Sequence, residues 1–157
     1  MNRLKSKRML ALAAFAVATL GIAWATPPVG LTSVNLNNGP ALLGDVDAKT
    51  ITDNWKVELR TKGESDVFVS HLTIAPGGEG GWHYHPGPSI ISVKSGTARF
   101  YHDHAPDSAH IHPTGSAFVE EAYMVHNVRN LEATDLELIV LQIVPKGAPR
   151  RIDAPAP

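Results

Sequence analysis

The sequence after residue 26 predicts an all-β domain of short antiparallel strands, arranged as a sandwich or a barrel. Three observations lead to this prediction. Alternating or continuous runs of β-branched and aliphatic residues are frequent. Turn signals rich in glycine, proline and serine recur about every ten residues. Helical periodicity is nearly absent, and only residues 41–52 could hold one or two helical turns.

The predicted strands follow one another with short connections. The run that begins at residue 67 stops at Pro76-Gly77-Gly78, because proline and consecutive glycines interrupt a strand. Two later runs are separated only by Ser95-Gly96, which predicts a tight hairpin between them. The predicted strands are Trp55–Thr61, Val67–Ala75, Ser89–Lys94, Thr97–His102, Ala117–Glu120, Met124–Val128 and Leu136–Val144.

Residues 1–25 have the features of a secretory signal peptide. Four basic residues lie within residues 1–9, an uncharged run covers residues 10–24, and Ala23-Trp24-Ala25 forms an A-x-A cleavage site. A membrane anchor is the alternative, but the apolar run is shorter than the roughly 20 residues that span a bilayer. We therefore expect cleavage before Thr26, export to the periplasm or the medium, and no membrane span after cleavage.

Length and composition fit a single globular domain of residues 26–145, followed by a proline-rich tail of residues 146–157. The chain has 157 residues, of which 43% are hydrophobic and 18% charged. We expect the tail to lie extended along the surface or to lack fixed structure. The absence of cysteine excludes disulfides, thiolate metal sites and a cysteine nucleophile. The net charge of −1, with no basic stripe, argues against a nucleic-acid partner.

Histidine is the residue type that points to a site, with 8 in the chain. In His83-Tyr84-His85, a strand would place both imidazoles on the same face, where they could bind one ion. A third histidine, His126, lies in a later strand-like segment. Neutral imidazole suits zinc, iron, nickel and copper, so these residues predict a transition-metal site.

The spacing around these histidines resembles the two motifs of the cupin superfamily. The first motif places a glycine, an H-x-H pair, a glutamate and a second glycine at fixed intervals, and the second places a glycine, P-x-G, a histidine and an asparagine. The corresponding positions here are Gly77, His83, His85, Ser89 and Gly96 in the first motif, and Gly115, Glu121, Tyr123, His126 and Asn130 in the second. The glycines at 77, 96 and 115, the three histidines and Asn130 match the motifs.

This resemblance implies a single cupin-type antiparallel jelly-roll barrel. It also implies a divalent transition metal (iron, manganese, nickel, copper or zinc) held by His83, His85 and His126 at the mouth of the barrel. Cupins commonly pair their barrels, so a homodimer is expected as well. The match covers residues 77–130, and the flanking strands extend it over most of the mature chain.

Two departures from the motifs affect the predicted ligands. Ser89 occupies the usual glutamate position, and a hydroxyl is a poor ligand for a divalent ion, so the expected set shrinks to three neutral histidines with open coordination positions. Glu120 or Glu121 could supply a carboxylate instead, although an exposed turn carboxylate is the more ordinary interpretation. Asn130 is expected to hold a strand or a histidine in place by hydrogen bonds. The loss of P-x-G leaves the shape of the loop before His126 open.

A second group of histidines, comprising His102, His104, His110 and His112, spans a connection between predicted strands. It could form an auxiliary zinc or copper site. The favoured interpretation is a polar, exposed connection.

These observations lead to three candidate functions. The leading one is an exported metal-dependent enzyme, either an oxygenase or an isomerase or lyase, which acts on a small organic molecule held beside the histidines. The alternative is a binding or sensing module that captures a small molecule or a metal without turnover. A structural barrel with adventitious metal is the third.

Overall fold

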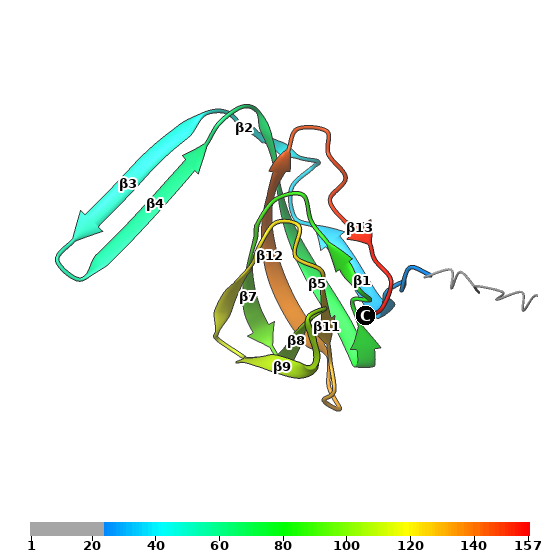
Figure 1. Cartoon of the computed structure of the whole chain (residues 1–157). Helices are drawn as coiled ribbons and strands as arrows, with labels where there is room; N and C mark the ends of the chain where they lie inside the picture. The colour runs from blue at the N-terminus through cyan, green and yellow to red at the C-terminus, as the bar shows by residue number, and fades with distance from the viewer. Residues whose placement is uncertain (1–23) are drawn as a thin grey trace, which may run out of the picture.

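Strands make up the regular structure of residues 24–157, the part of the chain that the computed structural model describes (Figure 1). The predicted all-β class is therefore confirmed. The strands are β1 (Val29–Asn35), β2 (Ala41–Leu43), β3 (Val46–Thr52), β4 (Trp55–Thr61), β5 (Ser65–Glu79), β6 (His83–Tyr84), β7 (Ser89–Ser95), β8 (Thr97–His102), β9 (Ala105–Pro113), β10 (Ala117–Glu120), β11 (His126–Arg129), β12 (Leu136–Pro145) and β13 (Ile152–Asp153).

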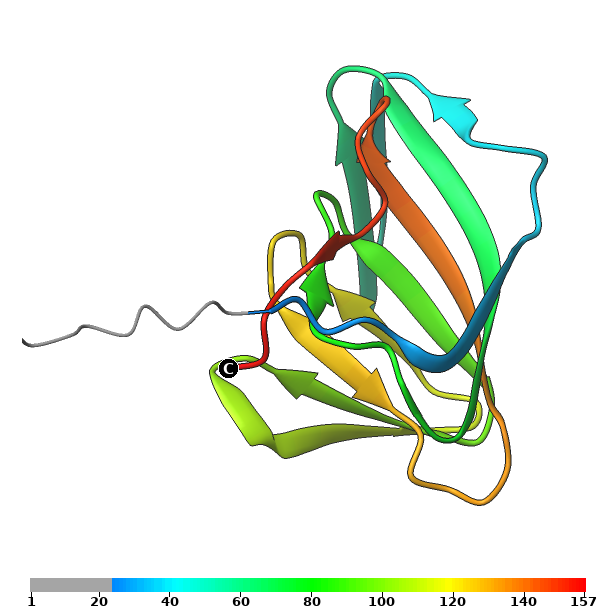
Figure 2. The same cartoon turned by 90° about the vertical axis from the view of Figure 1, so that its right-hand side faces the viewer.

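The barrel has two antiparallel walls joined through the long strand β5. One wall runs in the order β10-β7-β12-β5, and β1 and β2 also pair with β5. The other wall contains β9, β8, β11, β6 and β13. The walls meet where Arg129 of β11 pairs with Glu79 at the end of β5. Figure 2 shows the two walls facing each other, as in the jelly-roll barrel that the sequence predicts.

Inward-facing side chains of both walls form one apolar core. In β7 and β12, buried residues alternate with exposed or half-buried ones, as expected for strands with one face on a core. The core contains Ile74, Ile91, Val93, Ala98, Phe100, Val128, Leu136, Leu138 and Val140.

The predicted hairpin across Ser95-Gly96 is wrong. Strand β7 pairs with β10 and β12, whereas β8 pairs with β9 and β11, so the turn carries the chain from one wall to the other. Gly96 has a φ of 83°, and a Cβ there would lie 3.1 Å from the carbonyl oxygen of Asp135. A close approach to the turn before β12 therefore shapes this turn, rather than the pairing of its own flanking strands.

Residues 41–52 contain no helical turn. They form β2 and β3, and β3 pairs with β4 in a separate two-stranded sheet that projects from the barrel as an arm (Figure 1). One face of this arm is charged and contains the ion pairs Asp47–Arg60 (3.0 Å) and Lys49–Glu58 (2.8 Å).

The proline-rich segment after residue 145 is built into the barrel. Its strand β13 pairs Ile152 with Tyr84 and Asp153 with His83, and Ala154 is buried. The expected extended path is present, but residue 145 is no structural break, because backbone hydrogen bonds to β6 fix the tail.

Residues 1–23, which hold most of the predicted signal peptide, lie outside the described part of the chain. The described residues contain no helix that is long and apolar enough to cross a membrane.

Candidate metal centre

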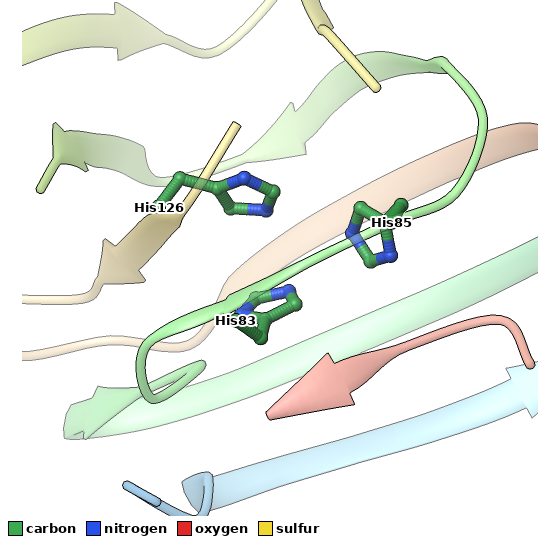
Figure 3. A group of neighbouring side chains, drawn as sticks. All are labelled: His83, His85 and His126. Carbon is green, nitrogen blue, oxygen red and sulfur yellow. The ribbon is translucent and has the colours of Figure 1, made fainter. Parts of the chain in front are cut away.

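Three histidines from two strands of the second wall meet at one end of the barrel interior. His83 lies in β6, His85 follows that strand, and His126 begins β11 and pairs with His83 in the sheet. The i, i+2 spacing of His83 and His85 directs both rings to the same side. Figure 3 shows the three rings facing a common space.

Each histidine donates a hydrogen bond from Nδ1 to a backbone carbonyl. This fixes the neutral tautomer that carries its proton on Nδ1 and leaves the Nε2 lone pair free for a ligand. The acceptors are the carbonyl oxygens of Gly81 for His83 (2.7 Å), Arg150 for His85 (2.6 Å) and Met124 for His126 (2.8 Å).

The three side chains are close enough to share an ion. One ligand nitrogen of each lies within 4.8 Å of those of the other two, and all three residues are buried. The Nε2 atom of His126 is fully buried and makes no hydrogen bond of good geometry within residues 24–157. A buried, unpaired lone pair next to two other imidazoles is the arrangement that a bound metal would satisfy.

Burial keeps these imidazoles in the form that binds metal. Desolvation, with the nearby His126 and Arg151, lowers the pKa of His83 to about 2. Burial also lowers the pKa of His126. Both rings are therefore neutral near pH 7, and no proton has to leave them before a metal binds.

The carboxylate of Glu120 joins this group from β10. Its Oε2 lies 3.3 Å from Nε2 of His85, and its Oε1 lies 3.3 Å from Nε2 of His126. Glu120 is only 5% exposed, so its interpretation as a solvated turn residue is wrong. Burial raises the pKa of Glu120, and positive charge on the neighbouring His126 and His85 lowers it by more. A metal ion at the three Nε2 atoms would supply that positive charge while the imidazoles stay neutral, so the carboxylate would be ionised in the metal-loaded site.

The place of Ser89 explains why Glu120 reaches this site. Ser89 and Glu120 pair directly across β7 and β10, so their side chains share the inner face of the wall. Ser89 is completely buried, as expected for a residue at the usual glutamate position. The carboxylate thus comes from the neighbouring strand.

The alternation of apolar and exposed residues within residues 117–120 indicates that Glu120 points into the barrel. Phe118 packs against the apolar core, and Glu120 lies two residues further along, on the same face of β10. Glu121 is exposed, as the ordinary interpretation of a turn carboxylate expects.

Asn130 lies apart from the histidines. Its side-chain amide donates to the carbonyls of Ile74 and Thr134, and its Oδ1 accepts from the backbone of Glu132. Asn130 therefore stabilises the turn between β11 and β12, which agrees with a strand-holding role and not with contact to a histidine.

The second group of histidines belongs to the β8–β9 pair. The ring of His102 lies 5.1 Å from that of His104 and 5.4 Å from that of His110, while His112 stacks on Phe118. Within residues 24–157, the only set of three or more potential ligands with metal-binding geometry is His83, His85 and His126. The structure therefore gives no support to an auxiliary metal site here.

A cavity of about 240 Å³ adjoins the histidine cluster. Its polar lining includes His85 and Glu120 at the cluster and Arg150 and Arg151 from the segment before β13. Neither arginine is among the predicted site residues, because both lie in the segment expected to be a surface tail. The walls are aliphatic: Leu31, Leu72, Ile91, Val128, Leu138 and Val140.

Residues 70–142 match the family model described as a cupin domain. This match supports the cupin superfamily that the motifs predict. No curated protein matches the chain.

Solved structures resemble the chain at low sequence identity. One is a cupin superfamily protein from Desulfitobacterium hafniense (12% identity, 73% of this chain and 77% of that one, TM-score 0.47). Another is KdgF from Halomonas sp. (16% identity, 72% of this chain and 78% of that one, TM-score 0.46). A third is a predicted oxalate decarboxylase from Thermotoga maritima (17% identity, 68% of this chain and 92% of that one, TM-score 0.43). The activities in these names are those of the neighbours.

Proposed function

We propose that this chain is a metal-dependent enzyme that holds a divalent transition metal through His83, His85, His126 and Glu120. One observation carries the proposal: three Nε2 atoms, left free because each Nδ1 is bonded to a carbonyl, converge in a buried site beside a carboxylate. Imidazole and carboxylate together suit zinc, iron, manganese, nickel or copper.

The bound metal would supply Lewis acidity for isomerase or lyase chemistry or, if redox-active, oxygenase chemistry. The protein's own residues prepare the site for it. The carbonyls of Gly81, Arg150 and Met124 hold the imidazoles in one orientation. The charge of Glu120 offsets part of the positive charge of the ion. The aliphatic walls of the cavity would pack against a small organic substrate beside the cluster.

The metal content of purified protein, measured by elemental analysis, tests the ligand assignment. Wild-type protein should hold about one transition metal per chain, and His126→Ala should lose most of it. The matched control is His104→Ala, because the side chain of His104 is 68% exposed and belongs to no metal-binding group of the described residues. Equal loss in both variants, or wild-type protein that binds no metal, would contradict the proposal.

Turnover separates the enzyme from the alternative, a binding or sensing module. Metal-loaded wild-type protein should consume oxygen, or convert substrate without oxygen, over a panel of small organic molecules, and His126→Ala should not. A tightly bound small molecule that is never converted would favour the binding module.

We also propose that the protein is exported after cleavage between Ala25 and Thr26. The backbone N–H of Thr26 donates to the carbonyl of Ala154, a bond that the new terminal amino group could keep. The intact mass of protein from the periplasm or the medium should correspond to a chain that begins at Thr26. An uncleaved mature chain would instead indicate an anchor.

A further inference from the structure

Arg150 is a rigidly held cation in the wall of the cavity. Its Nε donates to Oε1 of Gln142 (3.1 Å), and its Nη2 donates to Oγ of Ser70 (2.8 Å). Its Nη1 donates to Oδ1 of Asn35 (2.6 Å). The guanidinium also lies over the ring of Phe68, 4.3 Å from the centroid. These contacts come from β1, β5 and β12, so the side chain is fixed in one orientation.

None of these contacts neutralises the charge of Arg150. Every hydrogen-bond acceptor is an uncharged amide or hydroxyl oxygen. Within residues 24–157, no carboxylate lies within ion-pair distance of it. Burial lowers the pKa of Arg150, which reflects the cost of a desolvated positive charge. A fixed, half-buried guanidinium without a counter-ion favours an anion.

Arg151 differs from its neighbour in this respect. It lines the same cavity, but its Nε contacts Oδ1 of Asp153 at 2.5 Å, so its charge is compensated. Of the two arginines, only Arg150 therefore lacks a charged partner among the described residues.

The shape and lining of the cavity restrict the anion. Its volume of about 240 Å³ is below the range of roughly 300–1,000 Å³ that is usual for ligand pockets, so the ligand is small. The walls between the polar groups are aliphatic, which favours an apolar body. Three of the five N–H groups of Arg150 donate to protein acceptors, and the remaining one on each Nη can donate a charge-assisted hydrogen bond to a carboxylate.

We propose that Arg150 binds the carboxylate of a small, largely apolar organic acid, with the rest of the molecule extending toward His85 and Glu120. This inference rests on the proposed function for the reacting end of the molecule and names the class of substrate. The backbone carbonyl of Arg150 also holds His85, so one residue links the anion-binding group to the metal ligands.

Titration of the purified protein with benzoate and its neutral analogue benzamide, by calorimetry or NMR, tests the inference. Wild-type protein should bind benzoate about tenfold more tightly than benzamide, and Arg150→Gln should lose this preference. Because the backbone carbonyl of residue 150 remains in the variant, the hydrogen bond to His85 is kept. Arg151→Gln is the matched control and should keep the preference. Arg150→Lys should retain only part of it, because an ammonium group keeps the charge but cannot reproduce the three contacts that fix the guanidinium.

Equal affinities for the two probes, no saturable binding of benzoate at millimolar concentration, or equal effects of Arg150→Gln and Arg151→Gln would overturn the inference. The titrations are made with metal-free and zinc-loaded protein. If the protein binds neither zinc nor any of the other proposed metals, the proposed function fails, yet dependence of benzoate binding on Arg150 in metal-free protein would still support the anion site. If zinc binds normally and Arg150→Gln does not change the affinity for benzoate, only the proposal of the anion site is contradicted.

Discussion

At the scale of single residues, the position of one carboxylate determines the charge of the site. The cupin motif leads one to expect glutamate at residue 89, and the chain has serine there. The direct pairing of Ser89 with Glu120 places a carboxylate beside the same cluster from the opposite strand. The two positions can therefore be tested as alternative sources of one ligand.

Exchange of these two residues should move the carboxylate without removing it. Glu120→Ser should weaken zinc binding by about tenfold to a hundredfold, as the loss of a charged ligand does. The double variant Ser89→Glu/Glu120→Ser should recover most of the affinity, because both positions share one face of the wall. Competitive zinc titration measures both effects. If the double variant is no better than Glu120→Ser, Ser89 does not point at the metal.

The histidines of this site could be predicted from the sequence, whereas Glu120 and Arg150 could not be assigned. His83 and His85 depend on a local i, i+2 relation, and His126 on a motif of fixed spacing. The role of Glu120 depends on the register of β10 against β7, a contact between segments distant in sequence. Arg150 depends on the docking of a segment with no hydrophobic periodicity, which sequence patterns do not place.

At the scale of elements, the loop before His126 has a backbone conformation that favours glycine, although the chain has no glycine there. Tyr123 stands where the P-x-G motif has glycine, and it has a φ of 62°. Its backbone N–H donates to the carbonyl of His85 (2.8 Å), which ties the loop to the metal cluster. A side chain in this left-handed conformation costs about 1–2 kcal/mol.

Tyr123→Gly should therefore stabilise the protein by about 0.5–1 kcal/mol, after the greater flexibility of glycine in the unfolded chain is subtracted. The free energy of unfolding in urea measures the change. Tyr123→Ala is the control, because it removes the ring and retains the strained conformation; it should not stabilise. Equal effects of the two substitutions would assign the change in stability to the loss of the tyrosine ring and not to the backbone. Tyr123 is 66% exposed.

The order of the strands could be read from the sequence better than their pairing. The bounds of β4, β8 and β10 agree with the predicted runs, since alternation is a local property. The partner of each strand depends on tertiary contacts, so β7 and β8 looked like a hairpin although they lie in different walls. Residues 41–52 were ambiguous because short runs of mixed composition fit more than one period.

At the scale of the whole molecule, the β3–β4 arm has an apolar face that nothing in the described chain covers. Cross-strand pairs put Ala48, Val57, Leu59 and Trp55 on one face, opposite the charged one. Trp55, Val57 and Leu59 are 56%, 46% and 42% exposed. A two-stranded ribbon is only marginally stable by itself, so this face is expected to be covered by another surface.

The outer face of the barrel offers a matching surface. Ile90 and Val119 pair across β7 and β10, are 52% and 58% exposed, and lie at the edge of the first wall. In a twofold dimer, the arm of each copy would cover Ile90 and Val119 of the other copy. The same apolar contact would therefore form twice. The homodimer expected from the sequence stays a prediction, and these two surfaces are its proposed contact.

Light scattering of the purified protein tests this dimer. Wild-type protein should have the mass of two chains at micromolar concentration, and Trp55→Ser/Leu59→Ser should shift the mass toward one chain, because the double substitution removes the apolar face. Lys49→Ser/Lys56→Ser, on the charged face of the same arm, should leave the dimer intact. The barrel should keep its thermal unfolding transition in both variants, since β3 and β4 pair only with each other. A monomeric wild-type protein, or a dimer indifferent to Trp55 and Leu59, would show that the arm serves a different purpose.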